Sequence, residues 1–287
     1  MGAVKLKEQI MHGVFLVTAL ASIIAVLLIC IFLFANGIPA MKAIGLGDFL
    51  LGRDWSPGDV PPAFGIFPMI LGSLYVTAGA LFLGVPVGIF TAVFLASFCH
   101  KEIYRLIKPC VDLLAGIPSI VYGFFGMIII VPAIRALFHV NGSSIMAASI
   151  LLGIMILPTI IGISESSIKA VPESYYEGSL ALGASHEHSI FFTVVPAARS
   201  GILASVILGL GRAIGETMAV IMVAGNQPRM PAGVLRGVRT MTANIVLEMG
   251  YAAELHREAL VATGVVLFVF ILLINFSFSV LKRRGFQ

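Results

Sequence analysis

Long runs without a formal charge are the feature that most constrains the fold of this chain. An α-helix needs about 20 apolar residues to cross the hydrocarbon layer of a membrane. Six stretches are long and apolar enough, at about 14–35, 71–97, 113–134, 144–163, 202–223 and 259–280. The first is longer than the apolar core of a signal peptide, so we expect it to be retained as a helix. The sequence therefore predicts an all-α, polytopic membrane helix bundle with six transmembrane helices, in which residues 1–287 form a single domain.

The composition excludes several other classes of protein. Only 11% of the residues are charged and 59% are hydrophobic, whereas a soluble domain carries about 25% charged residues. A water-soluble enzyme and a disordered chain are both excluded on this ground. No basic block with interleaved aromatic residues indicates nucleic acid, so membrane lipid is the expected surrounding. The three cysteines form no CxxC or Cys/His pair at ligand spacing, and we expect no metal and no cofactor in this chain.

The distribution of Lys and Arg predicts the orientation, because cytoplasmic loops carry an excess of basic residues. With the N-terminus inside, ten basic residues are cytoplasmic: Lys5, Lys7, Lys101, Arg105, Lys108, Lys169, Arg199, Lys282, Arg283 and Arg284. Seven are then outside: Lys42, Arg53, Arg135, Arg229, Arg236, Arg239 and Arg257. Four of these seven lie in one loop, 225–258, and the other outer loops hold three. We therefore expect both termini in the cytoplasm. Whether Arg229, Arg236, Arg239 and Arg257 contact an anion or only solvate their loop stays open.

Two charges interrupt the fifth apolar stretch, in the run GLGRAIGETMAV at 209–220. Arg212 and Glu216 are four residues apart, which places them on one face of a continuous helix where they can pair. Intramembrane charges face protein or a wet cavity and are functional candidates by default. A guanidinium matches the geometry of phosphate-like oxyanions, so we predict a substrate pathway here, with Glu216 holding Arg212 when no anion is bound. The alternative is a purely structural ion pair.

Small residues lie beside this pair on the same helix. Ala204, Gly211 and Gly215 share one stripe of a helix with 3.6 residues per turn. Gly211 and Gly215 form a GxxxG spacing, which allows another helix to approach closely. We therefore predict helix packing along this stripe.

A long polar segment, 164–200, separates the fourth and fifth stretches. Pro172 and the acidic residue after it open a helix, Gly183 would stop that helix, and a second short segment would end at Pro196. A segment this long with little charge is typical of a docking surface. The alternative is a connecting loop that lies on the membrane surface.

This segment resembles the EAA motif of ABC-importer permeases. Glu177, Gly183 and Pro196 match the motif position by position, while Gly178 and Ser179 stand where two alanines are usual. The resemblance implies that these five residues belong to a coupling helix that sits in a groove of a separate cytoplasmic ATPase. It also implies the fold of type I ABC importer permeases.

Three further segments narrow the resemblance. The run GRAIGET at 211–217 is similar to a signature of phosphate-importer permeases, and 113–126 and 240–250 resemble the PstC class more than its sister PstA class. In that family the Arg and Glu of the signature are needed for phosphate passage, which implies these roles for Arg212 and Glu216. The resemblance also implies a PstA-type partner, two copies of an ATP-binding subunit, a periplasmic or lipid-anchored phosphate-binding protein, and location in the bacterial inner membrane.

The function implied by the resemblance is permeation of inorganic phosphate without catalysis in this chain. No GxxxxGK[ST] run is present in the sequence, so we expect ATP hydrolysis on the separate subunit. The alternatives are a permease for sulfate, molybdate or phosphonate, an ion-gradient-driven carrier, and a sensory or scaffolding subunit.

Overall fold

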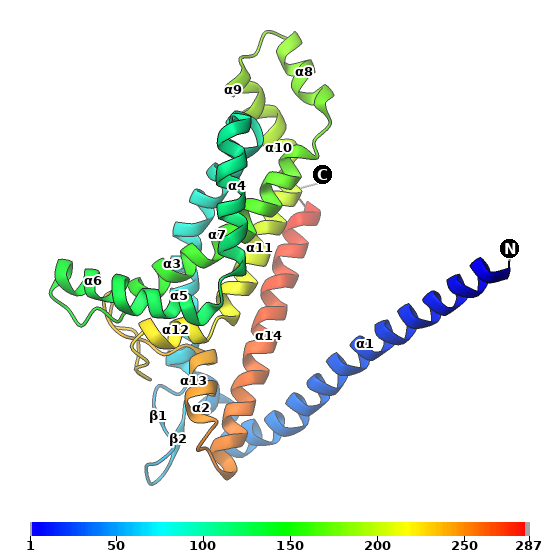
Figure 1. Ribbon diagram of the computed structural model, residues 1–287. Coiled ribbons are helices and arrows are strands. Elements are labelled where there is room, and N and C mark those ends of the chain that lie inside the picture. Colours follow the sequence, from blue (N-terminus) through cyan, green and yellow to red (C-terminus); the bar gives the residue numbers. More distant parts are fainter. Residues whose placement is uncertain (1, 285–287) are drawn as a thin grey trace.

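The protein is an almost entirely helical bundle in a computed structural model that describes residues 2–284 (Figure 1). The first half contains α1 (Gly2–Ile44), α2 (Leu46–Leu51), β1 (Trp55–Ser56), β2 (Ala63–Phe64), α3 (Phe67–Val93), the π-helical turn η1 (Phe94–Phe98), α4 (Lys101–Gly116), α5 (Ser119–Phe125), the π-helical turn η2 (Gly126–Ile130) and α6 (Val131–Phe138). The second half contains α7 (Ile145–Lys169), α8 (Glu173–Ala181), α9 (His186–Ser189), the π-helical turn η3 (Ile190–Val194), α10 (Val195–Ala197), α11 (Arg199–Gly215), α12 (Met218–Val223), α13 (Met241–Glu248) and α14 (Glu254–Arg284).

Five helical stretches are long and apolar enough to cross a membrane. They are Ile10–Ile44, Phe67–Phe98, Ser119–Phe138, Ile145–Lys169 and Glu254–Ser277. A sixth is obtained if His186–Ala197 and Arg199–Gly215, which meet at a bend of 68°, are taken as one span. The predicted helical class and the predicted number of spans are therefore confirmed, with the sixth span depending on a bent helix.

The centre of the bundle is built by α3, α7 and α11, which approach one another through glycines. A Cβ atom on Gly84 would lie 2.8 Å from the side chain of Ile156, and one on Gly88 would lie 2.7 Å from that of Ile160. Ile156 and Ile160 are fully buried. Close approach at small residues is how membrane helices gain packing energy, since lipid supplies little hydrophobic drive between helices.

The long helix α1 diverges from this bundle (Figure 1). It packs on α14 near its C-terminal end, where Gly37 faces Val265 and Ala262. Figure 1 also shows α8 at one end of the molecule and the β1–β2 hairpin at the other. We refer to these as the α8 end and the hairpin end.

Two predicted boundaries are wrong. The third span was predicted to start at residue 113, but 113–116 close α4, and Ile117 is extended with φ −71° and ψ 126°. Pro118 disfavours helical geometry in the residue before it, so the next helix starts at Ser119. The fourth helix continues past residue 163 to Lys169. The segment before α3 holds the paired strands β1 and β2.

Candidate functional site

The helix that carries Arg212 is broken before it reaches Glu216. Helix α11 ends at Gly215, Glu216 has extended backbone with φ −69° and ψ 132°, and α12 begins at Met218. The prediction that both charges lie on one face of a continuous helix is therefore wrong. The carboxylate of Glu216 instead accepts hydrogen bonds from the amides of Thr217 at 3.1 Å and Ala219 at 3.2 Å. The first amides of a helix have no partner within it, and Glu216 supplies one to α12.

Arg212 is half-buried and has one hydrogen bond among the described residues. Its Nη1 donates to Oγ1 of Thr159 on α7 at 3.4 Å, a long contact to a neutral group. A guanidinium carries five N–H donors. Most of the donors of Arg212 are therefore free of protein acceptors, and its charge is not neutralised by Glu216.

The stripe of small residues beside Arg212 faces open space within this chain. A Cβ atom on Gly211 or on Gly215 would meet no atom within 4 Å, and Ala204 is half-buried. Helix α11 packs on α7 through other positions. A Cβ atom on Gly209 would lie 3.2 Å from the side chain of Ile160, and Ser205 Oγ lies 2.8 Å from the Oγ of a serine on α7. Helix packing at the predicted stripe stays a prediction. A helix that packs there would have to belong to another chain.

The turn that terminates α8 is formed at Gly183, as the sequence predicts. Gly183 has φ +88°, its amide donates to the carbonyl of Leu180 at 2.9 Å, and the amide of Ala184 donates to the carbonyl of Ser179 at 3.2 Å. This pair of bonds is a Schellman motif, which requires a left-handed residue and favours glycine. The predicted helix start after Pro172 and the stop at Gly183 are both confirmed.

The surface around α8 is exposed and partly apolar. No residue of α8 is buried, and Glu177 and Gly178 are exposed. Leu182 and Phe192 are 92% and 69% exposed and line one groove with Ser179. The second segment runs to Ala197, one residue past the exposed Pro196. Exposed apolar groups gathered on one surface mark interaction sites, so Ser179 and Gly183, which line this groove, lie on a candidate docking surface. Glu177, Gly178 and Pro196 are exposed but do not line it.

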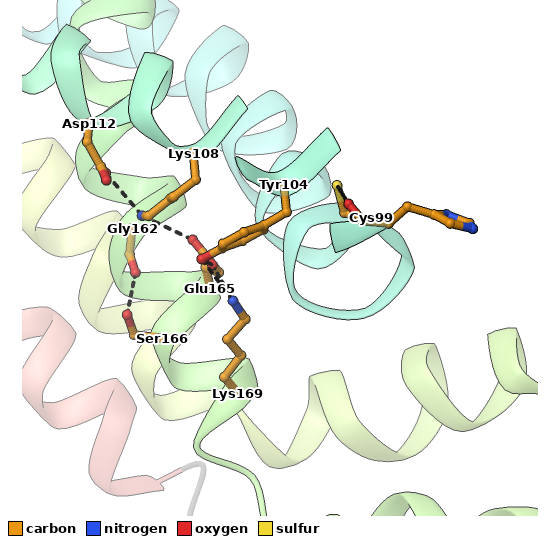
Figure 2. A network of polar contacts seen from close by, with 9 residues as sticks. Cys99, Tyr104, Lys108, Asp112, Gly162, Glu165, Ser166 and Lys169 are labelled. Atoms are coloured by element: carbon orange, nitrogen blue, oxygen red, sulfur yellow. Dashed lines mark hydrogen bonds and ion pairs between the residues drawn. The ribbon is translucent and has the colours of Figure 1, made fainter. Parts of the chain in front are cut away.

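Two buried carboxylates outside these sites were not predicted from the sequence. At the α8 end, Glu165 of α7 is 3% exposed and lies within a network of Tyr104, Lys108 and Lys169 (Figure 2). The spacing of Glu165 and Lys169 in a helix could have indicated part of this network. The contacts with α4 could not have been found, since they join residues about 60 positions apart.

The second carboxylate, Glu248, joins three segments at the hairpin end. Its Oε2 accepts from Nε1 of Trp55 at 2.9 Å and lies 2.8 Å from Nε2 of His256. Its Oε1 is paired with Arg239, whose Nε also donates to the carbonyl of Asn226 at 3.0 Å. Among the four arginines of the predicted outer loop, Arg239 therefore has a structural role, because its contacts with Glu248 and Asn226 hold the loop together.

The charges of this cluster shift the pKa of neighbouring Tyr251. Tyr251 is 70% exposed. Partial desolvation raises the pKa of its phenol, and the negative charge of Glu248 raises it further against the opposing effect of Arg239. The phenol is therefore neutral at any physiological pH.

Comparison with known proteins shows which family this chain belongs to. The model of binding-protein-dependent transport system inner membrane components matches residues 84–286. The chain is 38% identical over 280 residues to the probable ABC transporter permease protein YqgH of Bacillus subtilis, covering 93% of this chain and 90% of the relative. It is 34% identical over 292 residues to the phosphate transport system permease protein PstC of Mesorhizobium japonicum, covering 94% and 88%.

Solved structures show the same fold at low sequence identity. A chain from a bacterial alginate ABC transporter, in complex with a periplasmic protein that holds an alginate pentasaccharide, has a TM-score of 0.62 at 16% identity and 94% coverage of both chains. A chain of the MetNI methionine ABC transporter in an inward-facing conformation has a TM-score of 0.59 at 19% identity, covering 77% of this chain and 94% of that one. The chain therefore belongs to the binding-protein-dependent transport system inner membrane components, and it is a multi-pass inner-membrane permease subunit with the type I ABC importer fold.

Proposed function

We propose that this chain is the permease subunit of an ATP-driven importer that moves inorganic phosphate inward across the cytoplasmic membrane. The relatives named as phosphate transport permeases support the substrate. The observation that carries the proposal is the state of Arg212, a membrane-embedded cation with one long hydrogen bond and open space beside it.

The electrostatics of this site suit transient binding of an anion. Phosphate carries one to two negative charges near neutral pH, and a single guanidinium compensates them in part. Glu216 uses its carboxylate to cap α12, so Arg212 keeps its charge for the anion. Because one cation only partly neutralises phosphate, the site attracts the ion without holding it too tightly for release.

The same proposal assigns α8 to energy coupling. Two copies of a separate ATP-binding subunit would serve this chain and a PstA-type permease partner, and one copy would dock here against Glu177, Gly178, Ser179, Gly183 and Pro196. A periplasmic or lipid-anchored phosphate-binding protein would deliver phosphate at the hairpin end. Both termini would then be cytoplasmic, which fits the direction of α14 toward the α8 end (Figure 1).

The test is ATP-dependent uptake of labelled phosphate by the complex reconstituted with these partners. Arg212→Gln should lower uptake about 10- to 150-fold, because a hydrogen bond to a charged group contributes about 1.5–3 kcal/mol, while the complex still assembles. Arg105→Gln, which changes an exposed arginine of α4, is the control and should transport normally.

Three results would contradict the proposal. Normal uptake by Arg212→Gln would remove the pathway role. Competition by sulfate as strong as that by phosphate itself would favour a general oxyanion permease. Uptake by this chain alone, without ATP or partners, would favour an ion-gradient-driven carrier.

A further inference from the structure

The buried carboxylate of Glu165 has no part in the pathway or the docking surface described above. It accepts hydrogen bonds on Oε1 from the hydroxyl of Tyr104 and from Nζ of Lys169, both at 2.6 Å (Figure 2). Its Oε2 lies 3.1 Å from Nζ of Lys108, which is also 3.1 Å from a carboxylate oxygen of Asp112. One carboxylate on α7 thus holds two groups of α4 that lie one helical turn apart.

These contacts fix the position of α4 along α7. Burial alone would lower the pKa of Lys108, but Asp112 and Glu165 raise it above its ordinary value, so Lys108 is charged at physiological pH. A buried ion pair is often no more stabilising than well-packed apolar side chains. Its distinguishing property is that it depends on geometry, since the hydrogen bond from Tyr104 and the ion pair with Lys108 are lost if α4 slides by a fraction of a turn.

Glu165 lies close to the start of the candidate coupling helix. It is one turn before the end of α7 at Lys169, and α8 begins at Glu173. The segment between α8 and α11 is anchored to the same region, because Ile190 and Val194 pack in one buried cluster with Ile168 of α7. A displacement of α8 therefore acts directly on the end of α7.

A second contact ties this segment to the turn before α4. The hydroxyl of Tyr176 in α8 lies 2.8 Å from Nδ1 of His186, and the ring of His186 meets that of Phe98 edge-on at 4.9 Å. Phe98 ends η1, three residues before α4 begins at Lys101. Helix α4 is thus held at its start through Phe98 and along its length through Glu165.

The far end of α4 leads toward the candidate pathway. The chain turns at Pro118, and the hydroxyl of Tyr122 in α5 donates back to the carbonyl of Leu114 in α4 at 2.8 Å. Helix α5 in turn packs tightly on α12, where a Cβ atom on Gly123 would lie 3.0 Å from Cα of Ala219. The amide of Ala219 is one of the two that Glu216 caps.

We propose that Glu165 is a positioning residue for transport, which locks α4 to the end of α7 so that movement of α8 reaches α5 and α12 beside Arg212. This inference rests on the proposed function, because it assumes that an ATPase moves α8. Contiguous packing between two sites does not by itself prove energetic coupling. The inference therefore needs a measurement of coupling and not only of stability.

The test uses Glu165→Gln and Lys108→Met in the full reconstituted complex. Glu165→Gln keeps the shape and an acceptor for Tyr104 while removing the charge. Lys108→Met leaves Glu165 with Tyr104 and Lys169, and the Lys108 side chain is 24% exposed, so this variant should fold even if the other does not. Arg105→Gln is the matched control, since Arg105 is on the same helix in an exposed pair with Glu102.

Two ratios are measured for assembled complex: ATP hydrolysed per phosphate moved, and stimulation of ATP hydrolysis by the binding protein. We expect both test variants to raise the first ratio about fivefold or more, the lower end of usual coupling between sites, and to lose stimulation. The double variant should be no worse than the more affected single one, because residues that act as a unit are not additive. Arg105→Gln should match the wild type.

Wild-type ratios in both variants would overturn the inference. A lower yield or melting temperature with unchanged ratios would also overturn it, because that pattern belongs to a purely structural role. Failure of the proposed function looks different: the wild-type complex would move no phosphate. Stimulation by the binding protein would then still report whether Glu165 couples α8 to the rest of the chain.

Discussion

Replacement of Gly183 by alanine tests the candidate coupling helix at its most constrained residue. Gly183 has φ +88°, and a Cβ atom placed there would meet nothing within 4 Å. The substitution therefore creates no clash, and its cost comes from the backbone alone. A left-handed conformation costs a residue with a Cβ about 1–2 kcal/mol.

This cost falls on α8 rather than on the bundle. No residue of α8 is buried, so its last turn depends on the amide bonds of Gly183 and Ala184 at 2.9 and 3.2 Å. If the ATPase recognises the native turn, the population of that turn limits binding. A loss of 1–2 kcal/mol then weakens binding about 5- to 30-fold, and the amides of residues 183 and 184 should exchange hydrogen faster by a similar factor.

The assay is binding of the ATP-binding subunit to the detergent-solubilised permease pair, together with amide hydrogen exchange. Gly178→Ala is the matched control, because Gly178 is also in open space but has helical backbone, where alanine is favoured by about 0.5–1 kcal/mol. Alanine is also the residue that is usual at this position of the motif, so the change should be compatible with docking. Gly178→Ala should bind as well as the wild type or better. Equal binding by Gly183→Ala and the wild type, with faster exchange at residues 183 and 184, would show that the substitution destabilises the turn and that the ATPase does not need it.

Two further predictions concern the hairpin end. Glu248→Ala should lower the stability of the permease by up to about 3 kcal/mol, because it leaves Arg239, whose side chain is 14% exposed, without its carboxylate partner. The double variant Glu248→Leu with Arg239→Met should recover most of the melting temperature, and no recovery would contradict the ion-pair account. The pKa of Tyr251 is raised above its ordinary value of 10.0 by partial desolvation and by Glu248, so the unfolded chain loses this proton first and stability falls slightly as pH rises above 10. Tyr251→Phe should reduce that alkaline loss in melting curves, and an identical pH dependence would argue against it.

Features set by local chemistry were predictable from the sequence. The spans follow from apolar length, and the stop of α8 follows from one glycine with the required backbone freedom. Pro118 also acts locally, yet its effect was missed. The apolar run continues through it, and hydropathy carries no information about where a helix turns. The predicted span therefore joined residues 113–116 of α4 to a helix that starts at Ser119.

Features set by distant contacts were not predictable. Trp55 and Glu248 are 193 positions apart and share a hydrogen bond, and Tyr104 and Glu165 are 61 apart. The sequence around a single carboxylate in a polar stretch does not indicate that the carboxylate is buried. Burial becomes evident only when the fold brings its distant partners next to it. Arg239 likewise looked like one of four equivalent loop arginines, although it alone of the four is paired with Glu248.

The same sequence spacing gave opposite results at two places, which shows what such spacing can establish. Glu165 and Lys169 are four residues apart in α7 and form an ion pair at 2.6 Å. Arg212 and Glu216 have the same spacing, but α11 ends at Gly215 between them. The order acid-then-base is the more favourable one in a helix, whereas Glu216 follows its cation, is preceded by a poor helix former, and has unpaired amides of the next helix within reach. The carboxylate of Glu216 is therefore bound by backbone amides, and Arg212 is not paired with it because the helix stops where it does.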